Sequence, residues 1–180
     1  ILNLNNYVIE ESIKVDGKPE SIVIDGTDLW VGIQMNNDYS DGNKLLKIST
    51  VSNSISETHE IGKGPTSLTV INNNVYVANT YYDANYNAFY GSSKLNAISK
   101  EVDINYYGSG VVCGGDVLNY NNDIFRSFSG GAAKLGSDLK ILEQTKIGSY
   151  DAAQLYSSEI IGDYIYFGIT DYNETNQVKV

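Results

Sequence analysis

The stretch KGPTSLTVINNNVYVANT, Lys63–Thr80, is the clearest structural signal in the sequence because it contains two short strands and the turn between them. The strands are predicted at Ser67–Ile71 and Val75–Asn79, where Leu, Val, Ile and Tyr favour a pleated, half-buried surface. The turn is predicted at Asn72–Asn74, since Asn tolerates the left-handed backbone that a tight hairpin turn requires. The stretch therefore predicts a β-hairpin.

This hairpin pattern occurs four times along the chain. An earlier copy is Gly17–Gln34, and later copies are Asp116–Phe128 and Ser157–Thr170. Successive copies are 41 to 49 residues apart, a period typical of repeat architectures. The residues at equivalent points of the second strand are Leu29, Val75, Ile124 and Ile165.

Each of the first three copies is followed by two more predicted strands. These strands are Lys44–Thr50 and Ser54–Ile61, then Ser93–Ser99 and Glu101–Tyr106, then Ala133–Leu135 and Leu139–Ile147. Four short antiparallel strands per unit are typical of a β-propeller blade. No sustained 3.6-residue apolar period exists, which excludes helical solenoids. We therefore predict an all-β propeller of four-stranded antiparallel blades, with repeats at about 17–62, 63–108, 109–148 and 149–180.

Both ends of the chain fall partway through a repeat. Ile1–Asn5 resembles the end of a third strand, and Tyr7–Val15 alternates apolar and polar residues like a fourth. Gln177–Val180 reads as the third strand of the last repeat, so we expect residues 1–16 to complete that blade. Two architectures follow: a closed four-bladed ring, or four consecutive blades of a ring of six to eight. We prefer the second.

The phrase G-x-P-x-S-L followed by V-Y-V-A-N-T in Gly64–Thr80 resembles the Tyr-Val-Thr-Asn (YVTN) repeat of bacterial and archaeal surface-layer β-propellers. The third repeat departs from it, with Val112–Gly115 in place of the Pro turn, and the fourth has Tyr150–Ala152 there. The resemblance implies a propeller at a cell surface, secreted or periplasmic. Because the motif is structural, it implies a fold more strongly than a function.

Composition argues against several classes of partner. The net charge of the 180 residues is −10, with a pI of about 4.4, whereas a nucleic-acid binder needs a basic surface. Anionic membranes are disfavoured as binding partners for the same reason. The sequence contains no run of about 18 apolar residues, the length needed to span a bilayer. Cys113 is the only cysteine, so no internal disulfide forms.

Catalytic chemistry has little support in the sequence. The only histidine, His59, lies in the predicted outermost strand of its blade, far from the axis. Its place also argues against similarity to streptogramin lyases, which rely on an active-site His. Cys113 could be a reactive thiol near the channel mouth, but no basic residue is close in sequence, so we interpret it as a small core residue. We therefore expect a non-catalytic protein.

Two groups of carboxylates are candidate metal ligands. Asp38 and Asp41 belong to a set of oxygen donors around Gly42 that could bind Ca²⁺, although the spacing departs from an EF-hand and turn formation explains it as well. No other cofactor is predicted.

The second group lies near the predicted starts of inner strands. Asp116, Asp151 and Glu20 could hold a divalent ion at the channel mouth. That arrangement would resemble lactonase-type propellers, and it is the basis of an alternative hypothesis of a metal-dependent enzyme.

Three polar loops carry the most functional information. Asn36–Asn43, Thr80–Gly91 and Thr170–Asn176 each contain an adjacent Asp and Tyr, and blade geometry gathers them on one face. The third repeat shortens this loop to Ser129–Gly131. Tyr with Asn or Asp is the composition of binding surfaces such as antibody paratopes. The competing interpretation is that these residues only populate strand edges and turns.

We therefore predict a binding or adhesion module whose loops contact a protein or glycan. A third hypothesis is capture of a small ligand, as in cobalamin-binding surface propellers. The predicted binding residues are Asp38, Tyr39, Tyr81, Tyr82, Asp83, Tyr86, Asp171 and Tyr172.

Overall fold

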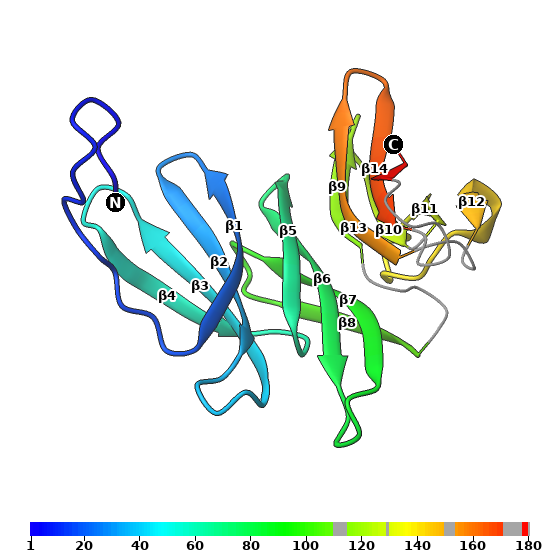
Figure 1. Ribbon diagram of the computed structural model, residues 1–180, viewed down its shortest axis with the longest axis horizontal. Helices are drawn as coiled ribbons and strands as arrows, with labels where there is room; N and C mark the ends of the chain where they lie inside the picture. The colour runs from blue at the N-terminus through cyan, green and yellow to red at the C-terminus, as the bar shows by residue number, and fades with distance from the viewer. Residues whose placement is uncertain (110–114, 129, 150–153, 171–177, 180) are drawn as a thin grey trace.

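The computed structural model describes residues 1–109, 115–128, 130–149, 154–170 and 178–179. Apart from the 3-10 turn η1, Glu143–Thr145, the regular elements of this part of the chain are strands. The strands form four antiparallel sheets that follow one another in sequence order, as Figure 1 shows. The expected all-β class and the antiparallel four-stranded unit are therefore confirmed.

Sheets 1, 2 and 3 have four strands each, and sheet 4 has three among the described residues. Sheet 1 contains β1 Lys18–Asp25, β2 Asp28–Met35, β3 Asp41–Ser49 and β4 Ser54–Glu60. Sheet 2 contains β5 Pro65–Ile71, β6 Asn74–Tyr82, β7 Ala88–Asn96 and β8 Val102–Gly108. Sheet 3 contains β9 Val117–Tyr120, β10 Asp123–Phe128, β11 Gly130–Lys134 and β12 Ile147–Ser149. Sheet 4 contains β13 Gln154–Ile161, β14 Tyr164–Thr170 and β15 Val178–Lys179.

The first hairpin of every sheet closes through a two-residue turn. In sheet 2 the turn residues Asn72 and Asn73 have φ of 48° and 60°, and in sheet 3 Asn121 and Asn122 have 49° and 68°. Paired positive φ angles match the right-handed twist of the flanking strands, which is why Asn is favoured there. The hairpin predicted from Lys63–Thr80 is confirmed, although its turn consists of Asn72 and Asn73 alone because Asn74 already belongs to β6.

The sheets meet along their first strands. β1 contacts β5, β5 contacts β9, and β9 contacts β13, so the first strand of each sheet lies beside that of the next. In Figure 1 sheet 1 lies beside the N-terminus on the left, sheet 2 lies in the middle, and sheets 3 and 4 overlap on the right, where the C-terminus is. Within the described residues this row of sheets does not close into a ring.

The main apolar core lies between sheets 1 and 2. Trp30 of β2 is fully buried and packs with Leu45 of sheet 1 against Val75, Val77 and Leu95 of sheet 2. A second cluster covers the opposite face of sheet 1, where Val31, Ile33, Leu46 and Ile48 are buried. Apolar residues on alternate positions of β2 thus serve two different interfaces.

A glycine with positive φ precedes the first strand of sheets 1, 2 and 3. At Gly17, Gly64 and Gly115 a Cβ atom would collide with the second strand of the same sheet. At Gly64 the clash is most severe, since a Cβ would lie 1.7 Å from the carbonyl oxygen of Thr80. The connection between sheets therefore requires glycine for space as well as for conformation.

Several predicted elements at the edges of the repeats are wrong. Ile1–Asn5 and Tyr7–Val15 are not strands, and only an isolated bridge joins Leu2 to Ile9. The strand predicted at Leu139–Ile147 is replaced by a turn, an isolated bridge at Ile141 and η1, and β12 starts only at Ile147. Alternating apolar residues mark a strand only where a neighbouring edge exists to pair with it.

Substitution of Gly64 tests the requirement for a tight junction. We expect Gly64→Ala to lower the free energy of unfolding by about 2–4 kcal/mol, from left-handed strain plus the clash. Gly26→Ala is the matched control, because Gly26 has nearly the same φ, 61° against 63°, but open space around its Cβ position. The control should lose only about 1 kcal/mol. Equal losses in urea titrations of the two variants would contradict this account.

Candidate functional site

Four of the predicted loop residues of the first two repeats line one cavity of about 350 Å³, namely Tyr39, Tyr82, Asp83 and Tyr86, whereas Asp38 and Tyr81 do not. Tyr39 comes from the loop between β2 and β3, Tyr86 from the loop between β6 and β7, and Tyr82 from the end of β6. We call this the tyrosine cavity, and it is lined by Met35, Tyr39, Ser40, Asp41, Tyr82, Asp83, Ala84 and Tyr86. Tyr39 and Tyr86 are 72% and 88% exposed, so both rings are open to a partner.

The two loops have the same backbone conformation. In the first, the Asn36 N–H donates to the Ser40 carbonyl at 2.9 Å and the Tyr39 N–H to the Asn36 carbonyl at 3.1 Å. In the second, the Asp83 N–H donates to the Asn87 carbonyl and the Tyr86 N–H to the Asp83 carbonyl, both at 3.0 Å. Tyr39 and Tyr86 therefore hold equivalent positions, with φ of 68° and 64°. A left-handed Tyr is uncommon, which sets these two residues apart from ordinary loop tyrosines.

Asp38 and Asp83 stabilise these loops from within. The Asp38 carboxylate accepts hydrogen bonds from the Ser40 hydroxyl and backbone N–H, which lowers its pKa. The Asp83 carboxylate accepts the Asn87 side-chain amide as well as backbone N–H groups of Asn85 and Asn87, and these bonds lower its pKa too. The sequence predicted both as polar contacts to a partner, but their oxygens mainly hold the loop turns.

Asp41 joins the two loops into one surface. Its Oδ1 accepts the backbone N–H of Tyr82 at 3.1 Å, across the boundary between sheets 1 and 2. Nearby, Lys18 places its Nζ 3.9 Å from the centroid of the Tyr39 ring, a cation–π contact. The neighbouring Gly42 is required by space, because a Cβ there would lie 2.3 Å from the Ile33 carbonyl oxygen. The Ca²⁺ site predicted here stays a prediction.

Tyr81 lies apart from the tyrosine cavity. It belongs to β6, stacks on Phe89 with ring centroids 5.6 Å apart and meets the edge of Tyr106 at 5.0 Å. Burial raises the pKa of its phenol. The loop predicted at Thr80–Gly91 is thus shortened, because β6 and β7 extend into it and turn Tyr81 into a packing residue.

A smaller polar cavity of about 210 Å³ adjoins the tyrosine cavity through the shared residue Tyr82. Glu20 and Asp116, two of the predicted metal ligands, both line it. The Asp116 Oδ2 accepts the backbone N–H and the hydroxyl of Ser158, each at 2.8 Å, and so links sheet 3 to sheet 4. Among the described residues no group of three or more His, Cys, Asp or Glu side chains could hold a metal ion.

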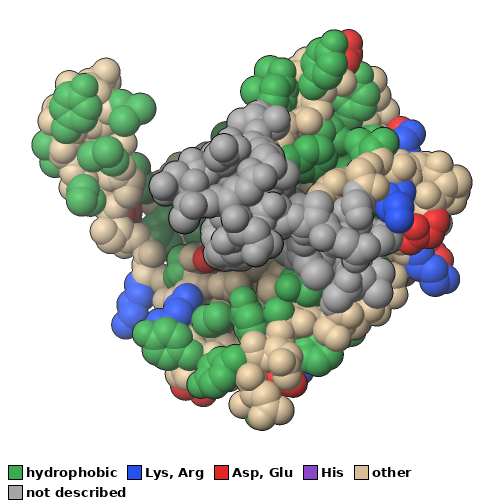
Figure 2. Space-filling view, turned by 45° about the vertical axis from the view of Figure 1, so that its right-hand side comes forward, with side chains coloured by type: hydrophobic (Ala, Val, Ile, Leu, Met, Phe, Trp, Pro, Cys, Tyr) green, Lys and Arg blue, Asp and Glu red, His purple; other side chains and the backbone are tan. Residues whose placement is uncertain are grey.

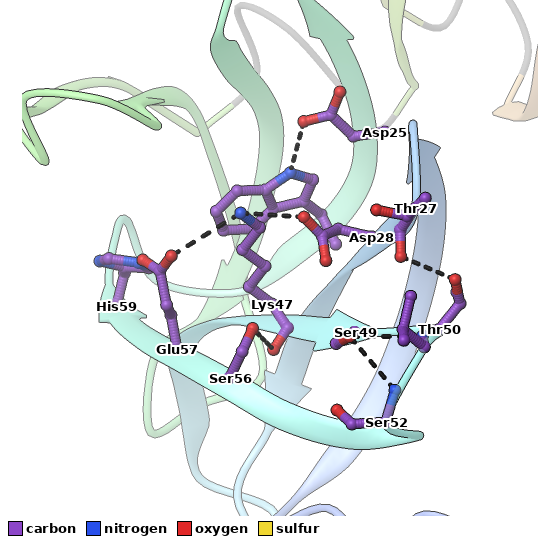
Figure 3. Close-up of polar contacts among 12 residues, drawn as sticks. Asp25, Thr27, Asp28, Lys47, Ser49, Thr50, Ser52, Ser56, Glu57 and His59 are labelled. Carbon is purple, nitrogen blue, oxygen red and sulfur yellow. Dashed lines mark hydrogen bonds and ion pairs between the residues drawn. The ribbon is translucent and has the colours of Figure 1, made fainter.

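His59 is part of a polar network on the outer strands of sheet 1, drawn in Figure 3. Its Nε2 lies 2.8 Å from the Glu57 carboxylate, and its ring lies 5.9 Å from that of Trp30. Lys47 and Lys100 also contact Glu57, at 3.7 and 2.5 Å, and Lys100 comes from the turn between β7 and β8. The network joins sheets 1 and 2 and provides no nucleophile beside the imidazole.

A fully buried cation was not anticipated from the sequence. Arg126 of β10 is completely shielded from solvent, and its Nη1 donates a hydrogen bond to the Ser127 carbonyl at 2.8 Å. Within the described part of the chain, its Nε and Nη2 have no hydrogen-bond partner. Burial lowers the pKa of the guanidinium to about 10. The residue at the equivalent position of sheet 2 is Val77, so Arg126 places a charge where that sheet has an apolar side chain.

Some predicted residues lie outside the described part of the chain. They are Cys113, Asp151, Asp171 and Tyr172. No helix among the described residues has the length and apolar character needed to cross a membrane.

The chain matches no known family model, and no curated protein is significantly similar to it.

The Asp83 carboxylate offers a test of the loop structure. We expect its pKa to lie below the ordinary value of 3.8 and to rise in Asn87→Ala, which removes the side-chain amide donor. Because the folded-state pKa is lowered, the loop is stabilised above about pH 4 and loses this support as the pH falls through the lowered pKa. Carboxyl-carbon NMR titration measures both values. Asn85→Ala is the control, since Asn85 contributes its backbone N–H, and it should leave the pKa unchanged.

Replacement of Arg126 tests the cost of the buried charge. We expect Arg126→Met to raise the free energy of unfolding by about 1–4 kcal/mol, as found when apolar residues replace buried ions. Because the folded-state pKa is about 10, below its usual value, wild-type stability rises as the pH passes through 10. The difference in free energy of unfolding between Arg126→Met and the wild type, measured by denaturant titration, should therefore be smaller at pH 11 than at pH 8. A less stable variant would show that the guanidinium has a compensating partner.

Proposed function

We propose that this chain is a non-catalytic β-propeller module that binds a protein or glycan through the tyrosine cavity and the loops around it. The propeller arrangement is supported by sheets that follow one another with their first strands side by side. The similarity of Gly64–Thr80 to the YVTN repeat supports a place at a bacterial or archaeal cell surface, secreted or periplasmic.

The observation that carries the proposal is the pair of equivalent tyrosines, Tyr39 and Tyr86. Each is held at the same point of the same five-residue turn, is largely exposed and borders one cavity. Tyr provides a large amphipathic contact with few rotatable bonds, so a preformed loop loses little entropy on binding. Asp38, Asp83 and Asp41 support this preorganisation because they hold the loops and join them.

A double substitution tests this function. We expect Tyr39→Ala/Tyr86→Ala to weaken wild-type binding at least tenfold on a printed glycan array or against a phage-displayed random peptide library. Tyr7→Ala/Tyr164→Ala is the matched control, because these tyrosines are also 78% and 70% exposed but lie outside the cavity. Both double variants should unfold at the wild-type urea midpoint. Unchanged binding by the first variant, or no enriched ligand for the wild type, would contradict the proposal.

A metal-dependent enzyme is the second candidate, because Glu20 and Asp116 line the same polar cavity. Elemental analysis of the purified protein distinguishes the two candidates. One divalent ion per chain that is lost in Glu20→Gln would favour the enzyme, since carboxylate oxygens are the ligands such ions take.

A further inference from the structure

The tyrosine cavity and the polar cavity beside it share one surface, because Tyr82 lines both. We call the two together the joined cavities. Two carboxylates line each of them: Asp41 and Asp83 in the first, Glu20 and Asp116 in the second. Among the described residues no Lys, Arg or His lines either cavity. Every Lys, Arg and His of the chain lies in the described part, so the joined cavities are acidic and disfavour an anionic ligand.

The positive charges of the chain are paired elsewhere. Every ion pair in the described part of the chain uses a carboxylate that lies outside the joined cavities. Figure 2 shows such pairs at its right-hand edge, where blue Lys or Arg side chains lie beside red Asp or Glu side chains. The carboxylates of the joined cavities therefore differ from most others on this protein, because no cation of the chain neutralises them.

Three of these carboxylates have an oxygen available to a ligand. Glu20 is exposed at the start of β1, and within the described part of the chain its side chain makes no hydrogen bond or ion pair. Asp41 binds the Tyr82 N–H through Oδ1, and Asp116 binds Ser158 through Oδ2. The second oxygen of each has no partner among the described residues. Only Asp83 uses both oxygens within its own loop.

The tyrosines of this region already attract cations within the protein. The Nζ atom of Lys18 lies 3.9 Å from the centroid of the Tyr39 ring, and that of Lys63 lies 5.7 Å from the centroid of the Tyr81 ring. Ammonium and guanidinium groups are drawn to the electron-rich face of an aromatic ring. In the described part of the chain Tyr86 has no such contact, although it is 88% exposed and borders the tyrosine cavity. A cation from a ligand thus finds a ring and carboxylates in one place.

We propose that the joined cavities bind a peptide segment through its positively charged side chains, which lie between the tyrosine rings and the carboxylates. The inference rests on the proposed binding function and names the class of its ligand, a cationic peptide in place of a glycan. Arg suits the site best, since its planar guanidinium stacks on a ring and donates to two carboxylate oxygens at once. The net charge of −10 also draws such a peptide to the protein. A neutral glycan would leave the carboxylates without a cation.

Peptide selection tests the class of ligand. A phage-displayed library of random peptides is selected on the immobilised chain in the presence of EDTA, which excludes a bridging divalent ion. The selected peptides should contain about twice as much Arg and Lys as the unselected library, because each such side chain adds attraction at this site. A printed array of neutral, sialylated and sulfated glycans, incubated with the same protein, should give no signal above background.

A neutral analogue of the selected peptide tests the role of its charge. Citrulline in place of Arg and norleucine in place of Lys keep the length of the side chains and remove the charge. Calorimetric titration should show binding of this analogue about tenfold weaker than that of the selected peptide, since both the ring contacts and the carboxylate contacts require a cation.

A single charge change on the protein locates the contact. Glu20→Gln keeps the shape of the side chain and should weaken binding of the selected peptide about fivefold, with no effect on the neutral analogue. Glu60→Gln is the matched control, because Glu60 is also exposed but lies at the end of β4, outside the joined cavities. It should leave the affinity unchanged. Both variants should unfold at the wild-type urea midpoint.

Four results would overturn the proposal: selected peptides without enrichment of Arg or Lys, equal affinity for the neutral analogue, unchanged affinity in Glu20→Gln, or an equal loss in Glu60→Gln. The last would mean attraction by net charge alone. A neutral glycan that the wild type binds and Tyr39→Ala/Tyr86→Ala does not would support the proposed binding function and contradict the cationic ligand. No ligand from either the library or the array would contradict both.

Discussion

The packing of one sheet on the next is the interaction on which the rest of this structure depends. Its clearest instance is Trp30, which leaves sheet 1 to fill the apolar surface of sheet 2 around Val75 and Val77. Full burial of such aromatic side chains contributes several kcal/mol, and no single sheet can bury it alone. The ion pair between Lys100 and Glu57 adds a second link at the outer strands. The sheets are therefore held by their neighbours.

The chemistry of this packing changes along the row. Between sheets 1 and 2 it is apolar, whereas between sheets 2 and 3 Tyr107 donates to the Leu139 carbonyl near the buried Arg126. Between sheets 3 and 4, Asp116 binds Ser158. Hydrogen-bonded interfaces contribute less net stability than apolar ones but fix register more strictly, because an unpaired buried group is costly. The later sheets thus depend more on specific partners.

The candidate site is a by-product of the same stacking. Equivalent loops of sheets 1 and 2 lie beside each other because their sheets do, and the cavity between them forms where Tyr39 and Tyr86 stand on neighbouring turns. The glycine junctions at Gly17 and Gly64 hold the chain close enough for Asp41 to reach the Tyr82 backbone. The packing of the sheets therefore holds the loops in place without help from a ligand.

The sequence alone was enough to predict the first hairpin of each sheet, its turn and the repeat of four units, because these depend on local alternation and on Asn at left-handed positions such as Asn72. It also contained the signal for the equivalent tyrosines, since Tyr39 and Tyr86 are one repeat apart. Only the tertiary structure decided that Tyr81 packs inside, that Asp83 holds its own loop and that residues 7–15 pair with no strand. Those outcomes depend on which surfaces meet in space, and a local pattern carries no information on distant neighbours.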